Sequence, residues 1–271
     1  MSSNHQAILP SLFVPHGAPT MALHPGAAGA VLAEYASVLP RPRAIVIVSA
    51  HWYTERPTVG LASQFETIHD FSGFPEALYS LRYSASGCPE AANEVVRCLT
   101  EAGFPVDTDR QRGLDHGAWV PLRLMFPDAD VPVIPLSMQG HLNSQHHFDL
   151  GRALAPLADK GFLILASGNL THNLRDFQTA VASGGQVPGY VREFADWIWQ
   201  RIQAHDLPAL LDYRARAPAA VRAHPTEDHL LPLFVALGAG GEQALAERFH
   251  AGIDSYVLAM DAFAFHRGGQ A

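Results

Sequence analysis

Histidine is the unusual residue of this chain, with 15 among 271 residues. Three of these histidines share one context, in which a short apolar run ends in a turn that carries the ring. They are His16, His51 and His172. Neutral imidazole is the commonest metal ligand in proteins, and its pKa near neutrality also suits proton transfer. The pattern therefore favours a histidine-rich metal site.

The apolar runs before these histidines predict strands of one sheet. Residues 8–14, 44–50 and 161–167 are short and apolar, as is typical of strands that a parallel sheet buries on both faces. In open α/β sheets, ligands bind just outside the carboxyl ends of the strands. If the three strands are parallel neighbours, their imidazoles could meet at one ion at about 2.0–2.1 Å.

Predicted strands alternate with helical patterns along the whole chain. This alternation predicts an α/β fold with a mostly parallel central sheet flanked by helices, and an active site at the carboxyl ends of the strands. We find no internal repeat and no linker, so we expect one domain over residues 1–271. Residues 1–8 and 263–271 are expected to be loose ends, and residues 255–260 the last strand.

His116 lies in a less regular setting. The glycines of the segment Gly113–Trp119 predict a tight turn. Asp115 could orient the His116 ring there, as carboxylates do beside metal sites. The competing interpretation is a loop histidine satisfied by nearby backbone.

His229 follows two acidic residues, Glu227 and Asp228, and precedes an apolar helix with a glycine stop at Gly238. Pro232 lacks an amide hydrogen, so this helix either starts late or is kinked near His229. The acidic side chains either favour the helix dipole or offer alternative oxygen ligands.

The segment 67–75 is rich in aromatic residues and turn formers, and long connections of this composition often cover a site. His69 in this loop is a candidate for contact with the substrate. Trp52 is a candidate wall of the pocket, with core packing as the alternative. His224, close to His229 in sequence, stays open as a further site histidine.

Composition excludes several classes of protein. The formal charge of −8 and a pI of about 6.0 disfavour nucleic-acid binding through a basic face. No apolar run approaches the roughly 20 residues of a membrane helix, and the first residues do not resemble a signal peptide. Cys88 and Cys98 suit neither a CxxC motif nor a disulfide framework, which indicates a reducing compartment. We therefore expect a cytoplasmic protein.

Other site types lack their motifs. The chain has no GxGxxG after a strand, no Walker loop, no GxSxG elbow and no HExxH. A metal site built from histidines is therefore the chemistry that the residues support best.

Six motifs together resemble a known family. They occur in the order Leu12–Pro19, Ser49–Thr54, Thr67–Tyr79, Asp115–Trp119, Ser167–Asn173 and Pro225–Pro232. The chain is similar, from about residue 10 to residue 262, to the DODA-type branch of the class III (LigB-like) extradiol ring-cleavage dioxygenases. This resemblance implies an enzyme that opens a catecholic ring with dioxygen at a mononuclear metal.

The resemblance also implies roles for five histidines. His16 and His51 match the first two metal ligands, and His229 matches the third. His172 matches the acid–base residue beside the metal, which is also a possible fourth ligand. His116 resembles a second catalytic histidine that helps to bind or polarise substrate and oxygen.

The implied ligand set departs from the usual facial triad of two histidines and one carboxylate. Three neutral imidazoles leave a divalent ion its full charge, which would favour a catecholate dianion. We expect one metal ion per chain, Fe(II) for activity and Zn(II) as a possible bound species, because zinc has no redox chemistry. The expected partners are a small DOPA-like or other catechol and dioxygen, with the chain a monomer or a homodimer.

Two other functions fit the same residues. A zinc hydrolase would use a metal-activated water to attack an ester or amide. A non-catalytic protein would bind a metal on an inherited fold. Metal dependence distinguishes the hydrolase from the dioxygenase, because zinc supports hydrolysis but not ring cleavage.

Overall fold

Residues Ala44–Tyr53 form β2, an interior strand of the central sheet. The computed structural model describes residues 8–268, and in it β2 pairs in parallel with β5 (Val133–Met138) and with β6 (Phe162–Gly168). β6 pairs in parallel with β1 (Ser11–Pro15). These strands are almost wholly buried, which explains why their sequences are nearly continuous apolar runs.

Four shorter or peripheral strands complete an eight-stranded sheet in the order β4-β3-β5-β2-β6-β1-β10-β7. The pairs β3–β5, β1–β10 and β10–β7 are antiparallel, and the others are parallel. The sheet is therefore mostly parallel, as predicted. The remaining strands are β3 (Thr58–Gly60), β4 (Asp107–Asp109), β7 (Leu245–His250) and β10 (Ala262–His266), with a separate pair β8 (Ile253–Asp254) and β9 (Leu258–Ala259).

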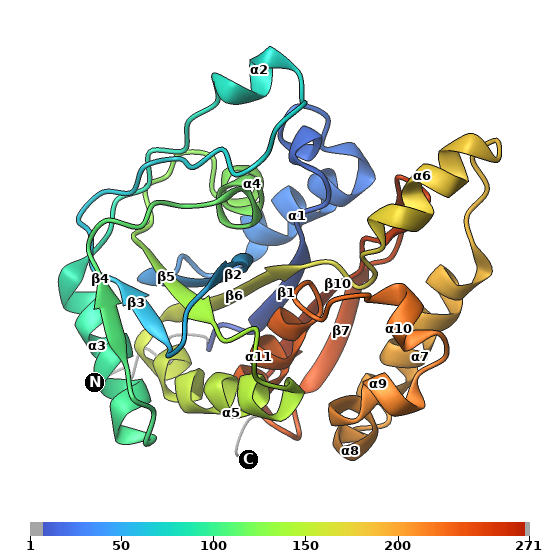
Figure 1. Cartoon of the computed structure of the whole chain (residues 1–271). Helices are drawn as coiled ribbons and strands as arrows, with labels where there is room; N and C mark the ends of the chain where they lie inside the picture. The colour runs from blue at the N-terminus through green and yellow to red at the C-terminus, as the bar shows by residue number, and fades with distance from the viewer. Residues whose placement is uncertain (1–7, 269–271) are drawn as a thin grey trace.

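Helices cover both faces of the sheet (Figure 1). α1 (Gly26–Val38) and α4 (His116–Met125) pack on one face, and α3 (Pro89–Glu101), α5 (Ser144–Leu154) and α11 (Leu231–Gly240) pack on the other. The other helical segments are η1 (Pro19–Ala22), α2 (Glu76–Tyr79), η2 (Ala155–Lys160), α6 (Leu174–Ala182), α7 (Gly189–Gln203), α8 (Leu207–Leu211), α9 (Tyr213–Arg216) and α10 (Ala220–Ala223).

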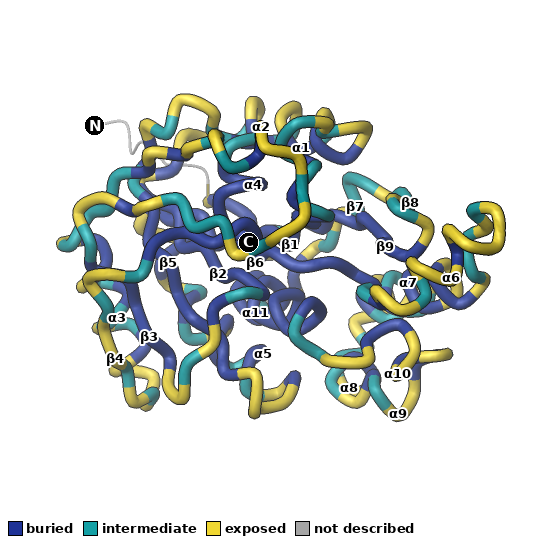
Figure 2. Tube along the Cα trace, turned by 45° about the horizontal axis from the view of Figure 1, so that its top comes forward, coloured by how far each residue is buried: buried dark blue, intermediate teal, exposed yellow. Residues whose placement is uncertain are grey.

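Side chains of β2 alternate between the two cores. Ile45 and Ile47 belong to the core beneath α1 and α4, and Val46 and Val48 belong to the core beneath α5 and α11. The chain trace is accordingly buried through the centre of the molecule and exposed along its outer loops (Figure 2). Within residues 8–268, no helix is both long and apolar enough to span a bilayer.

The segment around His116 is not the predicted turn. Asp115 caps a helix instead, since its carboxylate accepts the backbone N–H of Ala118 at 3.1 Å, and His116 is the first residue of α4. α11 begins at Leu231, so the late start suggested by Pro232 is confirmed. The helix runs to Gly240, beyond the predicted stop at Gly238.

The C-terminal prediction was wrong in two respects. Residues 255–260 do not form one strand, because Ser255 and Tyr256 adopt positive φ angles of 48° and 63° and separate β8 from β9. Residues 263–266 are not a loose end but most of β10, where Phe263 and Phe265 are fully buried. At the other end, β1 starts at Ser11, and residues 1–7 of the predicted loose N-terminus lie outside the described residues.

Candidate metal centre

The fold brings five histidines together at the carboxyl ends of the parallel strands. His16 directly follows β1, His51 lies near the end of β2, and His172 comes shortly after β6. His116 is the first residue of α4, and His229 lies just before α11. The convergence of the three strand-end histidines, predicted from the pattern alone, is therefore present.

Three of the rings form a regular triangle. The ring centroids of His16, His51 and His229 are 5.0, 5.2 and 4.9 Å apart, and Nε2 of His16 lies 3.2 Å from Nε2 of His51. Nitrogens that bind one ion at about 2.0–2.1 Å lie about 2.9 Å apart at a right angle and about 3.4 Å apart at a tetrahedral angle. The matching ring centroids would be about 4.5–5.2 Å apart. The triangle therefore fits a mononuclear divalent metal.

Hydrogen bonds fix the tautomer of His16. Its Nδ1 lies 2.9 Å from the hydroxyl of Ser167, and that hydroxyl donates to the backbone carbonyl of Gly117. Because a hydroxyl carries one hydrogen, Ser167 must accept from the Nδ1–H of His16. The Nε2 of His16 is then left with its lone pair in the centre of the site.

Carboxylates fix the tautomers of two other rings, His229 and His116. Nδ1 of His229 lies 2.6 Å from Asp228, and Nδ1 of His116 lies 3.0 Å from Asp70. An ionised carboxylate only accepts, so both histidines carry the hydrogen on Nδ1. Burial raises the pKa of Asp70, but hydrogen bonds and charge from His116 outweigh it and hold that pKa at about 2. This outer arrangement is typical of metal-binding histidines.

The triangle histidines are neutral at physiological pH. Burial, then the neighbouring imidazoles, lower the pKa of His16 and His229 well below the ordinary 6.5. Burial and then His116 lower the pKa of His51 to about 4, although the carboxylates of Asp115 and Asp70 raise it. Metal binding requires deprotonated imidazole, so these rings are prepared for it.

His172 has a different relation to the triangle. Its ring stacks on that of His229 with centroids 3.6 Å apart and planes 3° from parallel. Imidazole lone pairs lie in the ring plane, so the two rings direct their nitrogens along separate planes. Its backbone N–H donates to the carbonyl of Ala223 at 2.9 Å, which anchors the loop that carries it.

By the distances between donor atoms, these residues fall into two groups, each within 4.8 Å: His16, His51 and His116, and His172, Asp228 and His229. The triangle rests instead on its ring centroids and on the contact between Nε2 of His16 and Nε2 of His51. We favour the triangle for one ion. The rings of His51 and His116 are only 4.1 Å apart, closer than rings on one ion, and the stack of His172 on His229 separates their lone pairs. Asp228 uses its Oδ2 to hold Nδ1 of His229, and its buried Oδ1 has no hydrogen-bond partner among the described residues.

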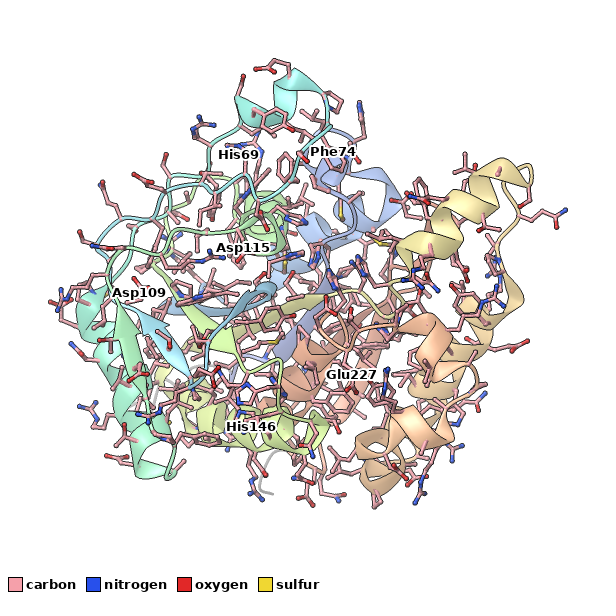
Figure 3. All side chains as sticks on the ribbon, in the orientation of Figure 1. His69, Phe74, Asp109, Asp115, His146 and Glu227 are labelled. Atoms are coloured by element: carbon pink, nitrogen blue, oxygen red, sulfur yellow. The ribbon has the colours of Figure 1, made fainter. Side chains whose placement is uncertain are left out.

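The other predicted site residues lie outside the cluster. His69 lies in the loop with Phe74 above the sheet (Figure 3), and its Nε2 is 3.2 Å from the carbonyl of Leu81. Trp52 is buried, with the guanidinium of Arg112 5.8 Å from its ring centroid.

His224 is also outside the cluster. It is fully buried, and its Nε2–H donates to the carbonyl of Leu170 at 2.8 Å, so it holds the loop after β6.

Two carboxylates that the sequence offered as possible partners of the site are bonded elsewhere. Asp115 does not orient His116; its Oδ1 accepts from Ser49 at 2.5 Å and its Oδ2 from Arg112 at 3.0 Å. Glu227 accepts from the hydroxyl of Tyr213 at 2.7 Å.

Sequence reasoning missed Asp70 and Ser167, the residues that hold the Nδ1 atoms of His116 and His16. Each had one available signal: Asp70 adjoins His69 in the loop expected to cover the site, and Ser167 ends a predicted strand.

Comparisons with known proteins identify the family of this chain. Residues 15–262 match the family model of the catalytic LigB subunit of aromatic ring-opening dioxygenase. The 4,5-DOPA dioxygenase extradiol of Beta vulgaris is 41% identical over 259 residues, which cover 94% of this chain and 96% of that protein. The 4,5-DOPA dioxygenase extradiol of Escherichia coli K12 is 39% identical over 239 residues, or 85% of each chain.

A solved structure shows the same fold. The crystal structure of an uncharacterized protein from Escherichia coli K12 matches with a TM-score of 0.78 and 30% identity, and the match covers 94% of this chain and 99% of that one. The family model spans nearly all of the chain, including every histidine of the cluster. The chain therefore belongs to the LigB family of aromatic ring-opening dioxygenases.

Proposed function

We propose that this protein is an extradiol dioxygenase that opens a catechol next to one of its hydroxyl groups, with one divalent metal held by His16, His51 and His229. The observation that carries the proposal is the regular triangle of these rings, 4.9–5.2 Å between centroids. The relatives from Beta vulgaris and Escherichia coli are named for 4,5-DOPA, so a DOPA-like catechol is the proposed substrate.

We propose Fe(II) as the metal. When bound, iron would supply both the charge that attracts the catechol oxygens and the redox capacity that dioxygen requires, which zinc lacks. The chain contributes three neutral donors, so the ion keeps its full charge for an anionic substrate.

His172 is the proposed acid–base residue rather than a fourth ligand. The stack on His229 directs its nitrogens out of the plane in which His229 would meet the metal. Burial lowers the pKa of His172, so the ring is neutral and can accept a proton from a catechol hydroxyl. It can return that proton later in the reaction.

His116 is proposed to stabilise negative charge on the substrate. Its Nδ1–H is held by Asp70, so Nε2 can accept a hydrogen bond from a hydroxyl. Once Nε2 takes up a proton, the ring becomes a cation whose charge Asp70 balances, and Nε2–H then donates to a developing oxyanion.

His69 and Trp52 remain predicted substrate contacts. The ring of Phe71 is 5.7 Å from that of His116 and 5.6 Å from that of His69, so this loop places an aromatic ring next to both histidines. Cytoplasmic location and a monomeric or dimeric state also remain predictions.

The test is anaerobic reconstitution of metal-free protein with Fe(II) or Zn(II), followed by air and a panel of catechols that includes DOPA. We expect oxygen uptake and a new yellow absorbance in the iron sample alone. Absence of uptake with every catechol would contradict the proposal. Ester or amide cleavage by the zinc form would support a hydrolase instead.

A further inference from the structure

Asp70 lies in the loop between β3 and α2 and accepts two hydrogen bonds from one histidine of the site, His116. Its Oδ1 accepts the backbone N–H of His116 at 2.9 Å and the ring Nδ1–H at 3.0 Å, and its Oδ2 lies 3.6 Å from Nδ1 of His51. We propose that Asp70 is a positioning residue, which fixes the ring orientation and tautomer of His116 so that Nε2 presents its lone pair to the substrate. The inference rests on the proposed function of His116.

The chemistry of the two groups explains the arrangement. A carboxylate has no hydrogen to donate, so the shared hydrogen must be on Nδ1, and the lone pair must be on Nε2. His116 is also the first residue of α4, where the backbone N–H has no partner within the helix. Asp70 satisfies this N–H while Asp115 satisfies that of Ala118, so two carboxylates from separate segments cap α4. Both anions suit the positive end of the helix.

The loop that carries Asp70 is itself tied to the start of α4. Leu114 N–H donates to the carbonyl of Glu66 at 2.8 Å, and Ile68 N–H donates to the carbonyl of Leu114 at 2.8 Å. The indole N–H of Trp119 donates to the carbonyl of Ile68 at 3.0 Å. These bonds place Asp70 against the first turn of α4 independently of its own carboxylate.

Close approach of the two segments depends on Gly113. A Cβ at this position would lie 2.4 Å from the carbonyl oxygen of Glu66, so a larger residue would push the loop away. The ring of Phe71, the next residue, meets that of His116 edge-on at 5.7 Å, with planes 88° apart. His116 is therefore contacted by two adjacent residues of one loop, Asp70 and Phe71.

The first variant is Asp70→Ala, which removes both hydrogen bonds. In zinc-loaded protein, imidazole ¹⁵N NMR spectra assigned with a His116→Gln variant report which nitrogen carries the hydrogen. We expect wild-type His116 to be the Nδ1–H tautomer and the alanine variant to populate Nε2–H. In the iron form we expect kcat to fall on the order of 100-fold, with little change in KM and full metal content.

The second variant, Asp70→Asn, keeps an oxygen at the same place but loses the charge. It should retain the Nδ1–H tautomer and recover part of kcat. Both the Nδ1–H population of His116 and kcat should therefore be highest in wild type, lower in the asparagine variant and lowest in the alanine variant. Asp128→Ala, at an exposed aspartate after α4, is the matched control and should match wild type. An alanine variant with the wild-type tautomer and kcat would overturn the proposal, and so would loss of metal in step with activity. The tautomer is measured without ring cleavage, so failure of the proposed function would be seen separately.

Discussion

His147 on α5 is as deeply buried as His16 at the end of β1. Both ring nitrogens of His147 are hydrogen-bonded, however, so neither is free to bind a metal. Its Nδ1–H donates to the carbonyl of Asn143 at 2.8 Å, and its Nε2 accepts the backbone N–H of Gln139 at 3.4 Å. His16 uses only Nδ1 for structure, and its Nε2 faces another imidazole. His224 also has a buried Nδ1 without a partner among the described residues, but it lies outside the cluster. What marks the site is therefore an uncommitted nitrogen that faces other imidazoles.

The pKa does not distinguish His147 from His16. Burial lowers the pKa of His147 to about 4, and burial also lowers that of His16 well below 6.5. Desolvation acts on any imidazole that the fold removes from water. The difference between a structural and a functional histidine lies in its hydrogen-bond partners.

The largest expected effect comes from removing a nitrogen of the triangle. His229→Gln should lose most of its bound metal after dialysis, and with it at least about a thousandfold of ring-cleavage activity, because two imidazoles hold a divalent ion poorly. His147→Gln, a change of the same kind at the other buried histidine, should keep the metal content. Metal analysis of both variants tests this difference, and equal metal loss from the two variants would contradict it.

Replacing His172 should separate proton transfer from metal binding. His172→Gln is expected to lower kcat by about 10²–10⁴-fold, the usual contribution of a general acid–base residue, with metal content near that of wild type. His146→Gln, outside the site on α5, is the control for both measurements. Loss of metal from the His172 variant would instead identify this ring as a ligand.

A smaller effect should follow from Ser167, which holds Nδ1 of His16. Ser167→Ala removes the acceptor and should weaken metal affinity by about 10–100-fold, the usual cost of losing an outer hydrogen bond. Ser144→Ala removes another buried hydroxyl, which donates to the carbonyl of Leu211. Competition with a metal chelator measures the metal affinity of both variants. Equal affinities would show that the hydrogen bond from His16 to Ser167 does not contribute to metal binding.

The sequence predicted the parts of the site that follow from sheet geometry. His16, His51 and His172 each end an apolar run, and parallel neighbouring strands bring such ends together. His116 and His229 have no such signal, because each precedes or starts a helix. Their assignment came from the order of motifs in the resemblance.

The contacts between side chains could not be predicted. Asp70 and His116 are 46 residues apart, and no periodicity links a loop to a helix start. Adjacency favoured Asp115 as the partner of His116, but a capping residue turns its carboxylate toward the helix, here to Ala118. β10 was missed because its Phe263 and Phe265 alternate with alanine in a short run near the chain end.

The smallest effect concerns the pH dependence of stability. The lowered pKa values of His16, His51 and His229 add to this dependence in wild type and variant alike, so the difference between the two proteins reports His147. In the folded state the pKa of His147 is about 4, whereas in the unfolded chain it returns to about 6.5. Between these values the unfolded state binds one more proton, so the free energy of unfolding falls as the pH falls. His147→Gln should therefore reduce this slope in the metal-free protein by up to about 1.4 kcal/mol per pH unit. Urea unfolding from pH 6.5 to 4.5 measures it. Phe148→Leu, at the neighbouring buried residue, should lower stability with the slope intact, and an unchanged slope in the His147 variant would contradict the prediction.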